Sequence, residues 1–261
     1  MPLLRAWNSD PYSLAAIWQI GEPEDFFVRE TGLTLPDIKS EKRRIERLAG
    51  RFLLKHLQSD FPLHGILPDG EDKPRVPDNR YFFSISHSWP YVAAVISPYA
   101  EAGIDIQCWR PRMQTLRHKF LSQEEQLLVG DDDKRITLAW CAKEAAYKWQ
   151  GRRGVEFSEH LALTRFATEA DAALSPGSAA VFRGNMPEDH LPGTTAFHML
   201  PPHVAGLPSG YEENAGHFFD IEINLKLSNP EKLLLLYGIV NEYFAFSIVR
   251  NNTQFLNLEL T

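Results

Sequence analysis

Side chains that could bind a metal ion or phosphate occur in several short segments of the chain. The first is Gly103–Gln107, an apolar segment that predicts a short strand. Alternate side chains of a strand share a face, so Asp105 and Gln107 point the same way. A carboxylate and an amide oxygen side by side can bind a hard cation. A solvated strand edge has the same pattern, and taken alone this simpler interpretation is favoured.

A second segment, Trp140–Lys148, predicts a helix. Glu144 and Lys148 lie one turn apart on it, about 6 Å along the axis. Such a pair is often an exposed stabilising ion pair. Here alanines at positions 139, 142, 145 and 146 indicate a closely packed helix, and buried Lys143, Glu144 and Lys148 would need partners. A metal ion and phosphates would serve.

Phosphate could also contact a third segment, Phe83–Ser88, and Lys73 shortly before it. Its hydroxyl groups and the imidazole of His87, together with the Lys73 ammonium, suit phosphate oxygens. Separately, His87 is more simply a turn histidine and Lys73 a solvated loop residue. Basic residues also line one face of a predicted helix, where a solvated surface is the simplest explanation: Lys42, Arg43, Arg44, Arg47 and Arg51.

The surrounding pattern predicts a mixed α and β chain. Apolar residues recur at helical spacing from 36 to 58, where Ser40 can cap part of the helix. Ser122 and Glu125 form the signature of a capping box, and a second helix spans 135–149 before Gly151. Candidate strands in the first part are 13–20, 81–86, 91–97 and 103–107.

After Leu161 the pattern changes to strands. The candidates are 181–183, 195–200, 217–227, 233–240, 243–249 and 254–260, and 185–216 is expected to be a long loop. Helix and strands are thus followed by helix and strands, which suggests two similar halves joined near Ala102.

Composition narrows the classes of function. The chain has 261 residues, with 27 Lys and Arg against 34 Asp and Glu, so its net charge is −7. This balance disfavours a nucleic-acid binder that uses its whole surface. Only two cysteines are present, Cys108 and Cys141, which excludes a disulfide scaffold or a four-cysteine zinc site. We expect a cytoplasmic protein without a membrane span. No phosphate loop, dinucleotide fingerprint, zinc helix or nucleophile elbow occurs in the sequence.

The order and spacing of these motifs resemble the 4′-phosphopantetheinyl transferases, specifically the tandem-domain, surfactin-synthetase type. The resemblance extends from about Lys42 to Val155. It comprises Gly50-Arg51, Lys73-Pro74, Phe83–Ser88, Gly103–Ile106, Phe120–Ser122 with Glu125, and Trp140, Lys143, Glu144, Ala145 and Lys148 with Gly151 and Gly154.

The resemblance implies an α+β fold of two similar α/β halves related by a pseudo-twofold axis, with the active site in the cleft between them. The N-terminal half, residues 1–102, would bind the nucleotide end. The C-terminal half, residues 103–261, would carry the metal site, the helix with Trp140 and Glu144, and the last strands. The implied enzyme is a holo-carrier-protein synthase. It uses Mg²⁺ to transfer the 4′-phosphopantetheine group from coenzyme A to a serine of an apo acyl or peptidyl carrier protein, releasing 3′,5′-ADP. It would act as a monomer, without nucleic acid or membrane.

Roles carried over from the family place Asp105, Glu144 and Lys148 at the reaction centre. Asp105, Glu144 and Gln107 would hold Mg²⁺, although many family members have Glu where this chain has Gln107. Lys148 would neutralise the diphosphate, and Glu144 is the candidate base for the serine proton.

Further residues would hold coenzyme A: Lys73, Ser86 and His87 at its nucleotide end, with Arg47 and Arg51 as helpers. Lys143 would bind the diphosphate or be structural. The alternative function is a non-catalytic relative that binds coenzyme A or a carrier protein without transfer. An unrelated metal-dependent nuclease is a distant third.

Overall fold

The computed structural model describes residues 3–10, 12–109, 113–168, 217–227 and 229–250, which form an α+β fold, as expected. The strands are β1 (Leu3–Asp10), β2 (Ser13–Gln19), β3 (Leu67–Pro68), β4 (Pro74–Arg75), β5 (Phe82–Ser88), β6 (Tyr91–Ser97), β7 (Ile104–Cys108), β8 (Leu161–Thr168), β9 (His217–Leu225), β10 (Lys232–Val240) and β11 (Phe244–Arg250). The helices are α1 (Glu24–Thr31), α2 (Glu41–Leu57), α3 (Met113–Leu116), α4 (Gln123–Val129), α5 (Asp133–Gln150) and α6 (Phe157–His160), with short 3-10 helices η1 (Leu63–Gly65) and η2 (Arg117–Lys119).

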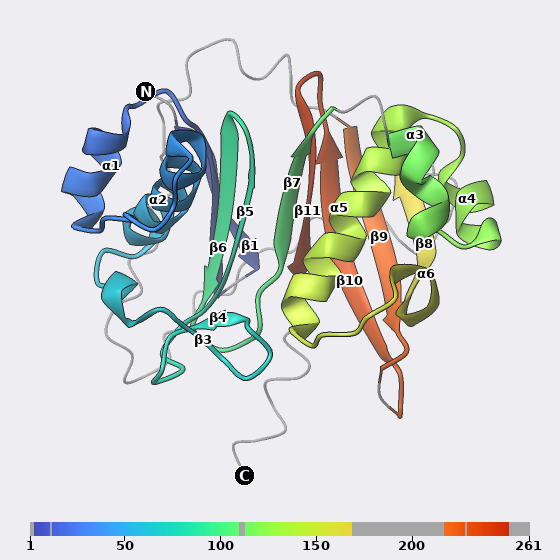
Figure 1. The fold of residues 1–261 in the computed structure, drawn as a ribbon. Coiled ribbons are helices and arrows are strands. Elements are labelled where there is room, and N and C mark those ends of the chain that lie inside the picture. The colour runs from blue at the N-terminus through green and yellow to red at the C-terminus, as the bar shows by residue number, and fades with distance from the viewer. Residues whose placement is uncertain (1–2, 11, 110–112, 169–216, 228, 251–261) are drawn as a thin grey trace, which may run out of the picture.

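The first sheet is antiparallel, in the order β1-β2-β6-β5, and α2 covers one of its faces (Figure 1). The predicted cap of α2 is confirmed, because the Ser40 side chain accepts a hydrogen bond from the backbone N–H of Arg43. A Cβ atom at Gly50 would lie 2.7 Å from Ile85 Cγ2. Glycine at this position therefore lets α2 approach β5 closely.

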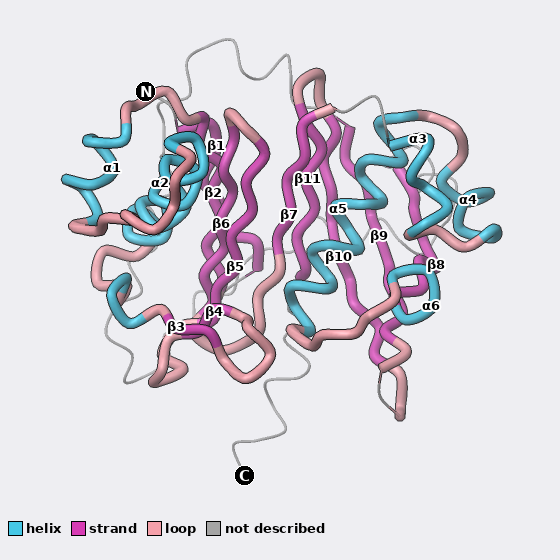
Figure 2. The backbone as a smooth tube through the Cα atoms, viewed as in Figure 1, coloured by secondary structure: helices cyan, strands magenta, loops and turns pink. Residues whose placement is uncertain are grey.

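The second sheet is also antiparallel, in the order β7-β11-β10-β9-β8, and α5 lies against it (Figure 2). The alanines of α5 are fully buried in this contact: Ala139, Ala142, Ala145 and Ala146. A Cβ atom at Gly103 would collide with the carbonyl oxygen of Ala145, so β7 starts directly against the backbone of α5. Small residues on both sides thus fix the distance between α5 and β7.

A third apolar core lies between the two sheets. The first sheet contributes Ala15, Ile17, Tyr91, Ala93 and Val95, and the second contributes Ile104, Ile106, Phe244, Phe246 and Ile248. The molecule is therefore layered as helix, sheet, sheet and helix, and the edge strands β5 and β7 lie next to each other.

Most predicted elements are confirmed within a few residues. The strand at 13–20 is β2, the helix within 36–58 is α2, and the helix at 135–149 is α5. The capping box is also confirmed, since Ser122 and Glu125 exchange side-chain and backbone hydrogen bonds at the start of α4. The sequence pattern does not predict β1, α1 and β8.

Other expectations fall on the rest of the chain. The strands expected at 181–183, 195–200 and 254–260, and the loop at 185–216, lie outside the described residues. The strands of the first sheet end at Ser97 and those of the second begin at Ile104. The division into 1–102 and 103–261 stays a proposal.

Candidate active site

Asp105 lies on β7, where alternate side chains take opposite directions as predicted. Ile104 and Ile106 enter the core between the sheets, whereas Asp105 turns toward α5. Lys148 Nζ lies 2.6 Å from Asp105 Oδ1 and also donates to the carbonyl oxygen of Ile104 at 3.2 Å. β7 and the last turns of α5 thus bring an acid and a base together from positions 43 residues apart.

Glu144 lies one turn before Lys148 on α5. Within the part of the chain that the structure describes, its carboxylate makes no hydrogen bond or ion pair. Burial, together with the negative charge of Asp105, raises the pKa of Glu144 to about 7, although Lys148 acts in the opposite direction. Two carboxylates close enough to repel each other form a site that favours a cation or a shared proton.

A row of three serines on β5 faces β7. Ser84 Oγ accepts a hydrogen bond from the backbone N–H of Ile104 at 3.2 Å. Ser86 Oγ donates to Asp105 Oδ1 at 2.6 Å, and Ser88 Oγ accepts from the backbone N–H of Cys108 at 2.9 Å. Serine side chains therefore connect two edge strands that share no backbone ladder.

Gln107 follows Asp105 on the same side of β7. Its side-chain nitrogen donates to Ser88 Oγ and to the backbone oxygen of Cys108, both at 3.0 Å. The amide nitrogen is therefore occupied, and the amide oxygen is the group left for a cation. Unlike a glutamate, it brings no charge.

A cavity of about 690 Å³ adjoins this cluster at the start of α2. It is lined by Asp37, Ile38, Lys39, Ser40, Arg43, Glu46, Arg47 and His87. The pKa of His87 is lowered by burial and by the positive charges of Lys148 and Arg47, against the opposing effect of Glu46. His87 therefore lines the cavity and also lies close enough to the Lys148 ammonium for that charge to lower its pKa.

Arg47 and Arg51 lie one turn apart on α2. Neither guanidinium has a hydrogen-bond or ion-pair partner among the described residues, and burial together with Arg47 lowers the pKa of Arg51. By contrast, Arg44 is held by Glu24 at 2.7 Å. Arg47 lines the cavity, where an unpaired guanidinium group can receive an anion, and Arg51 lies one turn further along α2.

Lys73 lies away from this cluster. Its ammonium contacts Glu101 Oε2 at 2.6 Å and the backbone oxygen of Trp149 at 2.9 Å, and its side chain is only 9% exposed. Burial lowers its pKa, and the charges that act on it come from Glu101, Arg75 and Asp69. Among the described residues Lys73 makes no hydrogen bond or ion pair with Ser86 or His87, and its predicted role at the nucleotide end stays a proposal.

Lys143 is fully buried, which fits the structural one of its two predicted roles. Its ammonium contacts both carboxylate oxygens of Glu125 at 2.7 Å and the backbone oxygens of Phe120 and Phe157. Burial lowers the pKa of Lys143 to about 8, against the charge of Glu125. Because its donors are occupied and it is inaccessible to solvent, we correct its assignment as a coenzyme A ligand.

Two residues of the site region escape the sequence-based prediction. Glu46 lines the cavity, with its carboxylate 3.7 Å from His87 Nδ1. Ser88 holds Gln107 and Cys108. The alternation of Ser84, Ser86 and Ser88 is the signal for the serine row, since these residues must share one face of a strand. Glu46 gives no such signal, because α2 alone does not reveal its contact with β5.

Comparison with known proteins gives the family context of this cluster. Residues 101–183 match the family model of the 4′-phosphopantetheinyl transferase superfamily. Asp105, Glu144 and Lys148 fall within this match, which agrees with the predicted resemblance to this superfamily.

Two curated relatives agree. The chain is 33% identical over 117 residues to the 4′-phosphopantetheinyl transferase AcpT of Escherichia coli O157:H7, and equally to AcpT of Escherichia coli strain K12. Each match covers 42% of this chain and 59% of the relative, so the chain spans about three fifths of the length of the curated relatives it matches. Together the matches support an enzyme of this kind.

The helices were compared in length and hydropathy with what a bilayer requires, and the finding concerns only them. None of those in the described ranges is long and apolar enough to cross a bilayer.

Proposed function

We propose that the protein is an Mg²⁺-dependent 4′-phosphopantetheinyl transferase of the tandem-domain type. It transfers phosphopantetheine from coenzyme A to a serine of an apo acyl or peptidyl carrier protein and releases 3′,5′-ADP. The observation that carries the proposal is the convergence of Asp105, Glu144 and Lys148 inside the region that matches the superfamily.

The donor set of the site fits Mg²⁺. Among the described residues, no group of three or more His, Cys, Asp or Glu side chains is arranged around a common metal position. Two carboxylates do converge, Asp105 and Glu144, and the oxygen of Gln107 is on the same side of β7. Mg²⁺ usually binds to one or two carboxylates, several waters and substrate phosphates. When bound, the ion would supply charge that stabilises the diphosphate.

In the proposed reaction, residues of this chain accept the proton of the carrier serine and neutralise the charge on the leaving group. The serine oxygen forms a bond to the β-phosphorus of coenzyme A, and the bond from that phosphorus to the bridging oxygen breaks. Glu144 is proposed to take the serine proton. Lys148 is proposed to neutralise the charge that develops on the departing 3′,5′-ADP.

Arg47, Arg51 and His87 are proposed to hold the nucleotide phosphates in the cavity beside α2. The two guanidinium groups have no partner in the described residues, and guanidinium binds phosphate through paired hydrogen bonds. Ser86 is proposed to contribute to this site through Asp105. Lys143 is left out because it is buried, and Lys73 is discussed below.

Mass spectrometry tests the function directly. The protein is incubated with Mg²⁺, coenzyme A and several apo carrier proteins, and the carriers are checked for the added phosphopantetheine. Glu144→Gln should abolish the modification, whereas Glu124→Gln, an exposed glutamate on α4, should retain it. Coenzyme A binding without modification of any carrier would instead support the non-catalytic alternative.

The setting is proposed from the same resemblance. The enzyme is expected to act in the cytoplasm as a monomer, since a single chain supplies both sides of the site. Sedimentation of the protein with and without carrier would test this stoichiometry.

A further inference from the structure

Lys73 connects three parts of the molecule through one ammonium group. It is the last residue of the β3–β4 turn, and its Nζ contacts Glu101 in the segment between the two sheets. The same Nζ donates to the backbone oxygen of Trp149, in the last turn of α5. With a side chain only 9% exposed, Lys73 offers little surface to a nucleotide.

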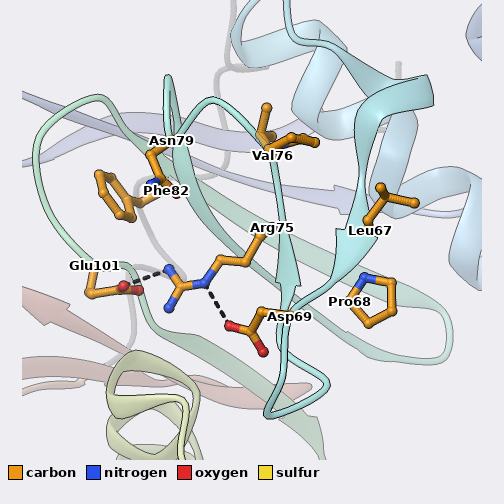
Figure 3. Close-up of a pocket in the computed structure, with 9 residues that line it drawn as sticks. Leu67, Pro68, Asp69, Arg75, Val76, Asn79, Phe82 and Glu101 are labelled. Carbon is orange, nitrogen blue, oxygen red and sulfur yellow. Dashed lines mark hydrogen bonds and ion pairs between the residues drawn. The ribbon is translucent and has the colours of Figure 1, made fainter.

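Neighbouring ion pairs hold Lys73 in this place. Figure 3 shows Arg75 between Asp69 and Glu101, with its Nε 3.0 Å from Asp69 Oδ2 and its Nη1 2.5 Å from Glu101 Oε1. Asp69 Oδ1 also accepts the backbone N–H of Lys73 at 2.9 Å. The adjacent cavity of about 530 Å³ is lined partly by these groups, whose charges are already paired with one another.

The turn after α5 is shaped to receive Lys73. Gly151 has a φ of +74°, which side chains rarely adopt, and a Cβ atom there would lie 2.7 Å from Lys73 Cδ. Glu71 accepts the backbone N–H of Arg153 at 3.0 Å, and Asp72 pairs with the Arg153 guanidinium. Residues 69–75 thus contact the C-terminal end of α5 at several points. We call these residues, with Glu101, Gly151 and Arg153, the α5 clasp.

The α5 clasp is connected to the candidate active site through the backbone of α5. Lys73 contacts the backbone oxygen of Trp149, and the preceding residue, Lys148, contacts Asp105. A shift of the last turn of α5 would therefore be expected to disturb the contact between Lys148 Nζ and Asp105 Oδ1, which are 2.6 Å apart. A displacement of about 1 Å at reacting groups can cost on the order of a hundredfold in rate.

We propose that Lys73 is a positioning residue, which fixes the last turn of α5 against the first half of the molecule and thereby places Lys148. This inference rests on the proposed function. It replaces the expectation that the Lys73 side chain binds the nucleotide, since Glu101 and Trp149 occupy its ammonium.

Two readouts separate the two roles of Lys73. In Lys73→Met, amide hydrogen exchange in residues 147–153 should become faster, and the transfer rate should fall at least about tenfold at saturating coenzyme A. The preference of the protein for 3′,5′-ADP over 5′-ADP, measured by calorimetry, should stay within about twofold of the wild type, because no phosphate contact is lost. Lys73→Arg should recover part of the rate, since guanidinium can reach both Glu101 and the Trp149 carbonyl.

Matched variants guard against a general folding defect. Gly151→Ala disturbs the α5 clasp without removing a cation, so it should also speed exchange in 147–153 and lower the rate, with unchanged nucleotide preference. Arg47→Met should do the reverse, losing the preference for 3′,5′-ADP with normal exchange.

Two outcomes would overturn the inference differently. If Lys73→Met lost the preference for 3′,5′-ADP while exchange in 147–153 stayed normal, Lys73 would be a phosphate ligand, and the proposed function would still stand. If the wild type bound neither nucleotide and modified no carrier, the proposed function would fail and the positioning role with it.

Discussion

Ser86 on β5 donates a hydrogen bond of 2.6 Å to Asp105 Oδ1 on β7. A residue of the first sheet thus holds a carboxylate that belongs to the second sheet. Lys148 contacts the same oxygen, and the buried Cys141 thiol is also hydrogen-bonded to the Asp105 carboxylate. The orientation of this carboxylate therefore depends on both sheets and on α5.

Removal of the Ser86 hydroxyl should weaken cation binding more than folding. Groups that orient a metal ligand typically change metal affinity by about 10–100-fold when mutated. We expect a loss of this size for Mn²⁺ in Ser86→Ala, measured by calorimetry with 3′,5′-ADP present. Ser84→Ala is the control, because that hydroxyl contacts a backbone N–H and not Asp105. Equal effects of the two changes would contradict an orienting role for Ser86.

Without divalent cations, Glu144 should titrate near pH 7. Its pKa in the folded protein lies above its ordinary value of 4.5, so the folded state holds this proton more tightly than the unfolded chain. Its contribution to the free energy of unfolding is therefore fully present below pH 4.5 and is lost as the pH rises toward 7. Carbon NMR should show the midpoint, and Glu144→Gln should flatten this part of the stability profile. A midpoint at the ordinary value would refute the burial effect.

Lys148 should oppose the raised pKa of Glu144, because its positive charge favours the carboxylate. Lys148→Met should therefore move the Glu144 midpoint upward, and Asp105→Asn should move it downward. The same NMR titration measures both. An unchanged midpoint in both variants would show that the three groups do not interact.

The Lys143–Glu125 pair should contribute strongly to stability. Lys143→Met leaves Glu125 buried without its cation, and the loss of one partner of a buried pair costs about 3–5 kcal/mol. Urea unfolding measures this cost. The double variant Lys143→Met with Glu125→Leu should lose less than the sum of the single changes. A loss below about 1 kcal/mol in Lys143→Met would mean that solvent reaches the pair.

Gly103→Ala should damage both the fold and the site. The added methyl group meets the backbone of α5 at Ala145, which has no rotamer to change, and overpacking of this kind costs about 1–3 kcal/mol or more. Thermal unfolding measures the loss. Gly70→Ala is the matched control, because nothing lies within 4 Å of its added atom. Similar melting temperatures for the two variants would contradict the close contact.

Local elements were largely predictable because their signals are local. Alternation placed Asp105 and Ile104 on opposite faces of β7, and the capping signature marked the start of α4. β1 was missed because Arg5 and Asn8 interrupt its apolar pattern, and α1 because it has only 8 residues.

Contacts between distant residues were not predictable in the same way. The sequence marked Lys73 and Lys143 as basic residues near motifs, yet it could not show that each is occupied by a carboxylate. Lys143 reaches Glu125 across 18 positions, and Lys73 reaches the Trp149 carbonyl across 76. Only the packing of α5 against its neighbours decides which cations are enclosed and which face a cavity.

The shared core between the two sheets has a consequence for the expression of the two parts of the chain as separate fragments. A fragment that stops at residue 102 would present Ile17, Tyr91 and Val95 to water, and the complementary fragment would present Ile106 and Phe246. Each fragment should therefore be prone to aggregation when it is expressed alone. When the two fragments are co-expressed, they should associate, because the apolar face of each sheet covers that of the other.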